Sequence, residues 1–288
     1  MSRFRFVDDH RDAYGVKRLC QLVEVSTSGY YVWRRRPPSP RAVADGELLV
    51  EIRRIHAASR CTYGAPRVHG QLRRGDLHVG CKRVARLMRQ DGLMGVPKRK
   101  WRRRRPDIAP APDRLNRDFT AARPNQRWVA DITEFPTGEG KLHVAGVRDL
   151  CHRGLVGWSM GPSPDAELVV DAVVMALGRC EPDADGLVHH SDKGGAYLSG
   201  DFCSMATLAG LEVSFGSTGD CWDNAAMETF WSTLKREIAW IRGSIWFPTR
   251  HDARLYLFEF IEVFYNRQRH QARLGHRTPA EFAATFNP

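Results

Sequence analysis

The sequence lacks several features that would place it among membrane or secreted proteins. Its 288 residues contain no apolar run near the length of about 20 residues that spans a membrane. The opening residues, MSRFRFVDDHRDAYG, hold no apolar stretch of the signal-peptide kind. The seven cysteines are scattered and form no C-x-x-C pair, which argues against a disulfide framework or a structural zinc site. We therefore expect a cytoplasmic protein without a membrane segment.

Lysine is also scarce, with 7 lysines against 37 arginines, and the formal net charge is +11. The flat guanidinium group of arginine donates to phosphate oxygens in pairs. A basic chain of this size indicates a polyanionic partner, and nucleic acid is the first candidate. The alternative is that the arginines reflect genomic composition and only solvate the surface.

The first 40 residues are predicted to form a helix-turn-helix-like segment. Residues 16–22 have helical spacing, residues 24–26 are typical of a turn, and residues 28–33 indicate a second helix. Two helices around a tight turn are the geometry of a DNA-reading pair. A plain helical hairpin that packs against its neighbours fits the same pattern. The proline-rich residues 37–40 end the segment.

A helical DNA-binding region is expected over residues 41–95. Its apolar positions include an imperfect stripe of Leu48, Val50, Ile52 and Ile55. Two further helices flank a turn at residues 75–76. On the later helix the apolar face carries Val84, Leu87 and Met88, and the basic face carries Lys82, Arg86 and Arg89. A basic outer face suits a helix that enters the major groove, although an ordinary solvated face has the same composition.

Residues 96–124 carry the densest positive charge. The run consists of Lys98, Arg99, Lys100, Arg102, Arg103, Arg104 and Arg105, interrupted only by Trp101. Because like charges repel and disfavour compact structure, we expect a basic linker here. Such a linker would bind the DNA backbone without reading its sequence.

From residue 125 to residue 288 the pattern changes to alternating strands and helices. Strands are expected at residues 127–133, 142–147, 155–160, 187–190 and 211–215. One helix is expected to be capped by Ser163, to begin at Pro164 and to end before Gly178. Further helices are expected at residues 202–208, 224–238 and 252–269, the last being apolar on most sides. The order βββαβαβα is typical of an α/β layered domain.

Three acids in this region have the surroundings of metal ligands. Asp131 lies within an apolar strand, Asp192 directly follows another strand, and Glu228 lies in the second turn of a helix. Their spacing alone proves little, because acids recur at any fixed spacing by chance in a chain with 33 of them. Three converging carboxylates can hold two divalent metal ions that drive phosphodiester cleavage and transfer. Oxygen ligands favour Mg2+, and Mn2+ can substitute.

Two side chains near these acids have less certain roles. Lys235 lies seven residues after Glu228 on the same helix face, where it could hold a phosphate. Phe230, Leu234 and Ile238 lie opposite and face the core, so an ordinary amphipathic helix explains the same pattern. His190 either assists proton transfer, orients Asp192, or is structural.

Four ordered motifs of the chain resemble the OrfB transposases of bacterial insertion sequences. They are WVADIT, HSDKGGAY, DNAAMETFWSTLKRE and YNRQRHQARLGHRTPAEF, and the upstream segments VSTSGYYVWRRRPPS and YGAPRVHGQLRR match as well. That family shares its catalytic core with retroviral integrases. The resemblance therefore implies an RNase H-like α/β core with a mixed five-stranded sheet, preceded by a helical, helix-turn-helix-like region and followed by a C-terminal helical tail.

The resemblance also implies roles for individual residues. Asp131, Asp192 and Glu228 would form the DDE triad that binds Mg2+, cleaves a transposon end to free a 3′-OH, and directs that hydroxyl at another phosphodiester. Lys235 matches the position that contacts terminal DNA, and Asn224 the position beside the third acid. The C-terminal signature, expected to be structural or DNA-facing, contains Tyr265, Asn266, Arg269 and His270. Ala196 replaces a glutamine that is frequent in the family.

The partners follow from the same resemblance. They are the transposon ends and target DNA, an OrfA protein supplied separately or as an OrfA–OrfB fusion, and further copies of the chain assembled on DNA, with the protein associated with the nucleoid. Two alternatives share the fold. One is a nuclease of the RNase H type that cuts without joining, and the other is a non-enzymatic DNA-binding repressor or a relic of an inactive element.

Overall fold

The computed structural model describes residues 2–97, 121–180, 182, 186–216 and 225–286. The chain divides into two compact units, Met1–Glu51 and Ile52–Pro288. Within the described ranges no helix is both long enough and apolar enough to cross a membrane. The predicted basic run from Lys98 to Arg105 lies outside the described residues, and so do Cys221 and Asn224.

The first unit contains three short helices around a small core. They are α1 (Arg3–Tyr14), α2 (Val16–Leu22) and α3 (Thr27–Arg35). Val7, Leu19, Cys20 and Tyr30 form the buried centre. The predicted helix, turn and helix over residues 16–33 are present, and the Ser26 hydroxyl caps α3 by accepting from the Gly29 amide. The sequence did not predict α1, whose only fully buried side chain is Val7 and whose apolar pattern is correspondingly weak.

Three more helices precede the sheet: α4 (Pro40–Ala58), α5 (Ala65–Arg74) and α6 (Cys81–Gln90). The predicted turn at residues 75–76 separates α5 from α6, and Val84, Leu87 and Met88 are buried as expected. The expected stripe on α4 was wrong at one position. Val50 is 65% exposed, because Leu48, Ile52 and Ile55 repeat at helical spacing and leave Val50 on the outer side.

A mixed five-stranded sheet forms the centre of the second unit. Its strands are β1 (Arg127–Thr137), β2 (Gly140–Asp149), β3 (Leu155–Gly161), β4 (Val188–Ser191) and β5 (Glu212–Phe215). The order across the sheet is β3-β2-β1-β4-β5. The first three strands form an antiparallel meander, and β4 and β5 run parallel to β1. The predicted mixed sheet is therefore confirmed, with β1 reaching Thr137 rather than ending at Thr133.

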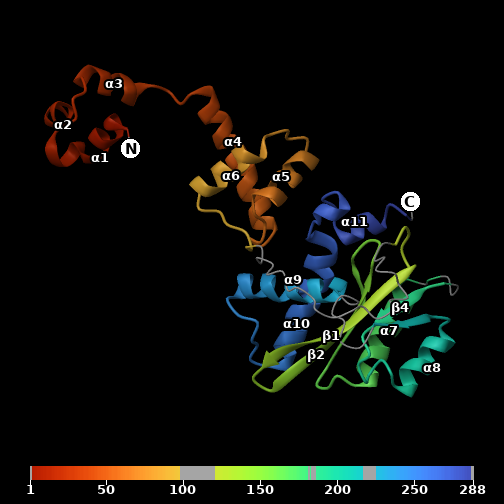
Figure 1. Ribbon diagram of the computed structural model, residues 1–288. Coiled ribbons are helices and arrows are strands. Elements are labelled where there is room, and N and C mark those ends of the chain that lie inside the picture. The colour runs from red at the N-terminus through yellow and green to blue at the C-terminus, as the bar shows by residue number, and fades with distance from the viewer. Residues whose placement is uncertain (1, 98–120, 181, 183–185, 217–224, 287–288) are drawn as a thin grey trace, which may run out of the picture. The chain divides into compact units, whose positions relative to one another are not determined.

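Helices cover both faces of this sheet (Figure 1). On one face lie α7 (Ala166–Cys180) and α8 (Gly200–Leu208), packed on Trp128 and Ala130 of β1. On the other lie α9 (Ala225–Arg242), α10 (Arg250–Glu259) and the π-helix η1 (Phe260–Gln268), packed on Val129 and Phe135. Because side chains alternate along a strand, Asp131 shares the α9 face with Val129 and Phe135. The short helices η2 (Ala272–Leu274) and α11 (Pro279–Ala283) end the described chain.

Two predicted helices differ from those observed. Helix α7 begins at Ala166, because the Asp165 carboxylate accepts from the Leu168 amide and caps it in place of Ser163, and Gly178 lies inside the helix. The helix expected at residues 252–269 changes from α to π geometry at Phe260. Its apolar surface is also less covered than expected, since Leu255 and Phe258 are largely exposed.

Candidate active site

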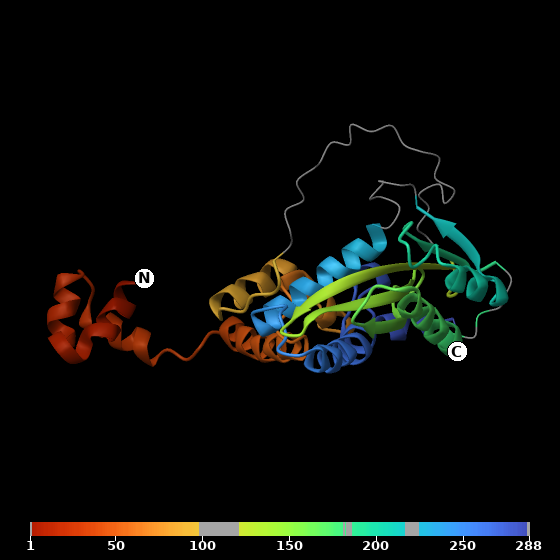
Figure 2. The same cartoon turned by 90° about the horizontal axis from the view of Figure 1, so that it is seen from below.

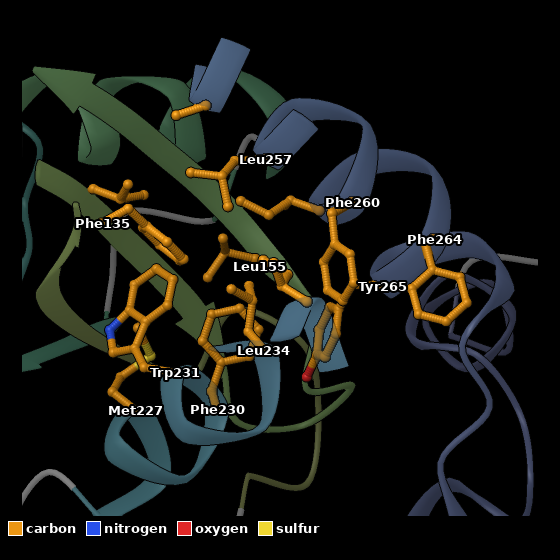
Figure 3. Close-up of a cluster of buried hydrophobic side chains, with 14 of the residues drawn as sticks. Phe135, Leu155, Met227, Phe230, Trp231, Leu234, Leu257, Phe260, Phe264 and Tyr265 are labelled. Carbon is orange, nitrogen blue, oxygen red and sulfur yellow. The ribbon is translucent and has the colours of Figure 1, made fainter. Parts of the chain in front are cut away.

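Asp131 lies in the central strand, directly beneath helix α9. Its partner across the antiparallel ladder is Gly146 of β2. A Cβ atom at Gly146 would lie 2.9 Å from the Trp231 ring, so the glycine allows α9 to pack this closely on the sheet. Figure 2 shows α9 running along the sheet, and Figure 3 shows Met227, Phe230, Trp231 and Leu234 of that helix pointing toward Phe135 and Leu155.

Asp192 directly follows β4, as predicted. Its Oδ1 accepts from the Gly194 amide at 3.1 Å, a local turn that fixes the carboxylate at the strand end. Tyr197 lies buried in the same segment, and burial raises its pKa well above the usual value, with the charges of Asp131 and Asp192 raising it further. The His189 ring packs beside Tyr197, with ring centres 6.1 Å apart, and lies 5.3 Å from the Phe202 ring. Burial lowers the pKa of His189 to about 4. These buried rings support the loop that carries Asp192.

Glu228 lies in the first described turn of α9 and is exposed, whereas the sequence placed it in the second turn. The opposite face of the helix is buried as predicted, with Phe230, Leu234 and Ile238 in the core. Lys235 extends over the Phe135 ring, with Nζ 5.4 Å from the ring centre. Burial lowers the pKa of Lys235, and the nearby carboxylates of Glu134 and Asp131 oppose that shift.

The electrostatics of Asp131 show that the three acids share one region. The pKa of Asp131 is raised to about 7, mainly by burial and in addition by the charges of Asp192 and Glu228. A hydrogen bond from the Ile132 backbone and the charge of Lys235 act in the opposite direction. Strand, loop and helix thus bring the predicted acids and Lys235 within electrostatic reach of one another.

The acids do not already form a closed metal-binding cluster. Among the residues that the structure describes, no group of three or more His, Cys, Asp or Glu side chains is arranged to hold a metal ion. The donor set nevertheless fits a hard divalent cation, because all three groups offer carboxylate oxygens. The pKa of Asp131 is raised first by burial and then by the charges of Asp192 and Glu228, and a bound cation would favour the ionised carboxylate. Asp131, Asp192 and Glu228 are therefore suitable ligands.

His190 has a structural environment. Its Nδ1 lies 3.1 Å from the Ser214 hydroxyl of the neighbouring strand β5, and its ring is 3% exposed. This contact favours the structural alternative over proton transfer. Ala196, at the position where the family often has glutamine, is partly buried and packs on the cluster around Tyr197.

The C-terminal signature makes internal contacts. The Asn266 side chain accepts from the Leu155 amide at 3.0 Å and donates to the Leu155 carbonyl at 2.9 Å, so it pairs with edge strand β3 as a further strand would. Tyr265 accepts a hydrogen bond from Arg148. Arg269 and His270 contact Glu237 and Tyr63. These contacts fit the structural alternative for all four residues.

Sequence reasoning missed one residue that bears on the site. Arg148 of β2 is 5% exposed and donates from Nη1 to the Ala226 carbonyl at 2.9 Å, two residues before Glu228. Its other donors reach the Arg153 carbonyl and the Tyr265 hydroxyl, both at 3.1 Å. An arginine at the end of the apolar run LHVAGVRD was the available signal, since a buried charge needs partners.

Comparison with known proteins agrees with this fold. A helix-turn-helix-like domain model matches residues 44–101, and two integrase core domain models match residues 121–221 and 209–279. The Shigella sonnei "Insertion element IS600 uncharacterized 31 kDa protein" is 40% identical over 93% of this chain and 98% of its own. The Escherichia coli transposase InsF of insertion sequence IS3A is 35% identical over 97% of this chain and 98% of its own length. The magnesium-bound HTLV-2 integrase catalytic core aligns at 14% identity with a TM-score of 0.44, covering 57% of this chain and 99% of that one.

These matches define a class and a family. The mixed sheet with its integrase core places the protein among the RNase H-like polynucleotidyl transferases of the DDE type, a class that depends on divalent metal. The chain belongs to the IS3 family of insertion-sequence transposases. The family, fold and enzyme class predicted from the motifs are thereby confirmed.

Proposed function

We propose that this chain cleaves DNA at insertion-sequence ends and joins the freed 3′-OH to a second phosphodiester, with Asp131, Asp192 and Glu228 as its catalytic metal ligands. The observation that carries the assignment is the arrangement of the elements: β1 lies beside β4, and α9 packs on the face of β1 that carries Asp131. The raised pKa of Asp131, a partly buried carboxyl group, supports it, because the charges of Asp192 and Glu228 contribute to the shift. Three separate elements, β1, the end of β4 and α9, supply these groups. The charges of Asp192 and Glu228 both act on Asp131, which supports a shared role.

Asp131, Asp192 and Glu228 would hold Mg2+, with Mn2+ able to substitute, and two such ions would supply activation of the attacking oxygen and charge stabilisation of the leaving one. The protein residues orient the reaction. Asp131 is fixed by its strand, and Asp192 by its turn with Gly194, so these two carboxylates are held before substrate arrives. Glu228 is exposed on α9 and would complete the set from that helix.

Lys235 would hold a phosphate of the terminal DNA. It lies two helical turns from Glu228 on the same side of α9, and its stem packs across Phe135. The charge of Lys235 acts on Asp131, which supports its placement at the reacting end of the DNA.

DNA binding beyond the catalytic site is assigned to basic groups in two regions. On α6, Arg86 is partly exposed, while Lys82 and Arg89 are exposed, over a buried apolar face. The run Lys98, Arg99, Lys100, Arg102, Arg103, Arg104 and Arg105 would follow the DNA backbone through charge alone. In this proposal residues 1–40 and 41–95 form the helical DNA-binding regions, residues 96–124 the basic linker, and residues 125–288 the catalytic core with its tail.

The remaining partners complete the proposal. An OrfA protein, separate or fused to this chain, would supply the main recognition of the element ends. Two ends must be brought together before joining, so at least two copies of the chain would assemble on DNA. The place of action would be the nucleoid within the cytoplasm.

One experiment separates this proposal from a nuclease or an inactive DNA-binding protein. The full chain, alone and with its upstream partner, is given a pre-cut element end bearing a 3′-OH together with Mg2+ and a labelled target duplex. Joined products support the transposase, cleavage without joining supports a nuclease, and binding without either supports the repressor or relic. Joining that persists in Asp131→Asn, Asp192→Asn and Glu228→Gln variants would exclude these acids as the ligands.

A further inference from the structure

Further along α9 from Glu228, the helix contacts α5 and the C-terminal segment. Glu237 lies nine residues after Glu228, about 14 Å along the axis at a rise of about 1.5 Å per residue. Arg269 donates to the Glu237 carboxylate through Nε and Nη2, both at 2.7 Å, and Arg67 of α5 reaches it at 3.3 Å. Glu237 and Arg269 are 2% and 4% exposed. This buried junction therefore joins α9, the C-terminal segment and α5.

The loop between α4 and α5 is held at the same junction. The Tyr63 hydroxyl accepts from the His270 amide at 2.6 Å, and the Trp240 indole donates to the Cys61 carbonyl at 2.9 Å. Arg60 forms a two-bond ion pair with Glu259 at the end of α10, one bond measuring 2.8 Å. Each contact joins residues about 170 or more positions apart in the chain, so none arises from local structure.

Helix α5 packs closely against the His276 side chain of the C-terminal segment. A Cβ atom at Gly70 would lie 2.1 Å from the His276 ring. Gln71 and Arg74 donate to the His276 carbonyl at 3.1 and 2.8 Å. A side chain at position 70 would therefore require the His276 ring to move away from α5.

We propose that this docking sets the distance between the base pairs contacted by α6 and the phosphodiester that is cut. The inference rests on the proposed function and adds a role for residues that touch neither DNA nor metal. Gly70, Tyr63, Arg67, Glu237 and Arg269 act as positioning residues, because α5 and α6 form one helix pair docked on the helix that carries Glu228. DNA held by α6 therefore reaches the three acids in one fixed register.

The register can be measured directly. Element-end DNA is labelled at one terminus, and the cut position is read at single-nucleotide resolution for the wild-type chain and for Gly70→Val. Gly178→Val is the matched control, since a Cβ atom at Gly178 in α7 meets nothing within 4 Å. We expect Gly70→Val to bind the end normally but to spread the cut over neighbouring positions and lower the rate at the correct one by about 100-fold. The control should cut like the wild type.

Charge reversal at an ion pair provides a second test, which does not require the fold to accommodate a larger side chain at position 70. Arg60→Glu and Glu259→Arg each break a partly exposed ion pair, and the double variant can restore it. We expect each single variant to broaden the cut distribution and the double variant to narrow it again. A purely stabilising role would lower the melting temperature and the yield of cut DNA without moving the cut.

The outcomes discriminate between the two proposals. If the wild-type chain cuts no end DNA, the proposed function is contradicted, whereas the docking of α5 on α9 is left in place. Wild-type cutting together with an unchanged cut position and rate in folded Gly70→Val overturns the inference. If Gly70→Val does not fold, single charge-reversal variants that cut with wild-type register overturn it.

Discussion

Arg148 and Ala226 are joined by a hydrogen bond of 2.9 Å between the guanidinium Nη1 and the backbone carbonyl. This bond fixes the first turn of α9 against β2, two residues before Glu228. The same guanidinium donates to Tyr265 of the C-terminal signature. The position of Glu228 thus depends on a buried side chain that lies outside all three predicted acid motifs.

Replacing Arg148 should therefore impair catalysis through geometry. Arg148→Met leaves the Ala226 and Arg153 carbonyls without this donor, and we expect a loss of stability of about 1–3 kcal/mol. We also expect cleavage to fall by at least about 10-fold at temperatures where the variant is folded, with end-DNA binding retained. Tyr265→Phe is the control, because it removes the Tyr265 hydroxyl and leaves the bond to Ala226 in place. Equal loss of cleavage in both variants would contradict a specific role at α9.

The three acids should each be indispensable for strand cutting. Asp131→Asn, Asp192→Asn and Glu228→Gln remove one charged ligand while keeping the side-chain size. Charge stabilisation by bound metal contributes several kcal/mol, so cleavage should fall by at least about 1000-fold. Binding of end DNA should change little, and gel-shift and cleavage assays on the same samples measure the two effects. Near-normal cutting by any one variant would remove that residue from the ligand set.

Asp131 should lower the stability of the metal-free protein at high pH. Its pKa is raised from 3.8 to about 7 by burial and by the neighbouring acids, so the folded chain holds a proton that the unfolded chain releases. Stability is therefore lost as pH rises from about 4 to about 7, and the loss is complete above the folded pKa. In EDTA, Asp131→Asn should melt higher than the wild type at pH 8 and equally at low pH.

Metal provides the internal control for that measurement. Adding Mg2+ or Mn2+ at pH 8 should raise the melting temperature of the wild type, because a ligand that binds only the folded state stabilises it. The same addition should have little effect on Asp131→Asn. A melting difference between the two chains that does not vary with pH would show that Asp131 carries no unfavourable charge.

DNA binding should weaken steeply with salt. Each phosphate bound by lysine or arginine releases counterions, so the logarithm of affinity should fall linearly with the logarithm of salt concentration. Replacing the four arginines at positions 102–105 with glutamine should reduce that slope by roughly one for each phosphate that the variant no longer binds. Fluorescence anisotropy should show that the variant loses the same amount of salt slope on element-end duplexes as on unrelated duplexes. An affinity that does not change with salt concentration would exclude binding to the DNA backbone as its main source.

The sequence predicted the parts of the site that depend on local pattern. Asp131 was visible as an acid in an apolar strand, and Asp192 as an acid at a strand end. Phe230, Leu234 and Ile238 showed the buried face of α9 through helical spacing. Each of these signals needs only a few neighbouring residues.

Long-range contacts carried no such signal. Arg148 and Ala226 lie 78 positions apart, and Tyr63 and His270 lie 207 apart. The start of α7 was misplaced because Ser163 and Asp165 are both good caps, and only the observed bond to Leu168 decides between them. The π geometry after Phe260 was not foreseen because it is set by packing of Phe260, Ile261, Phe264 and Tyr265 against the sheet.

The segment after α10 contacts both the edge of the sheet and the junction between α5 and α9. Asn266 pairs with the edge of the sheet, while Arg269 and His270 hold the loop and helix at Tyr63 and Glu237. Recombination between related elements that exchanged only the front half of the gene would separate α5 from the tail shaped to receive it. The contacts of Asn266, Arg269 and His270 would persist in such a chimaera only where both parents carry matching residues, so we expect chimaeras exchanged upstream of the tail to be less stable.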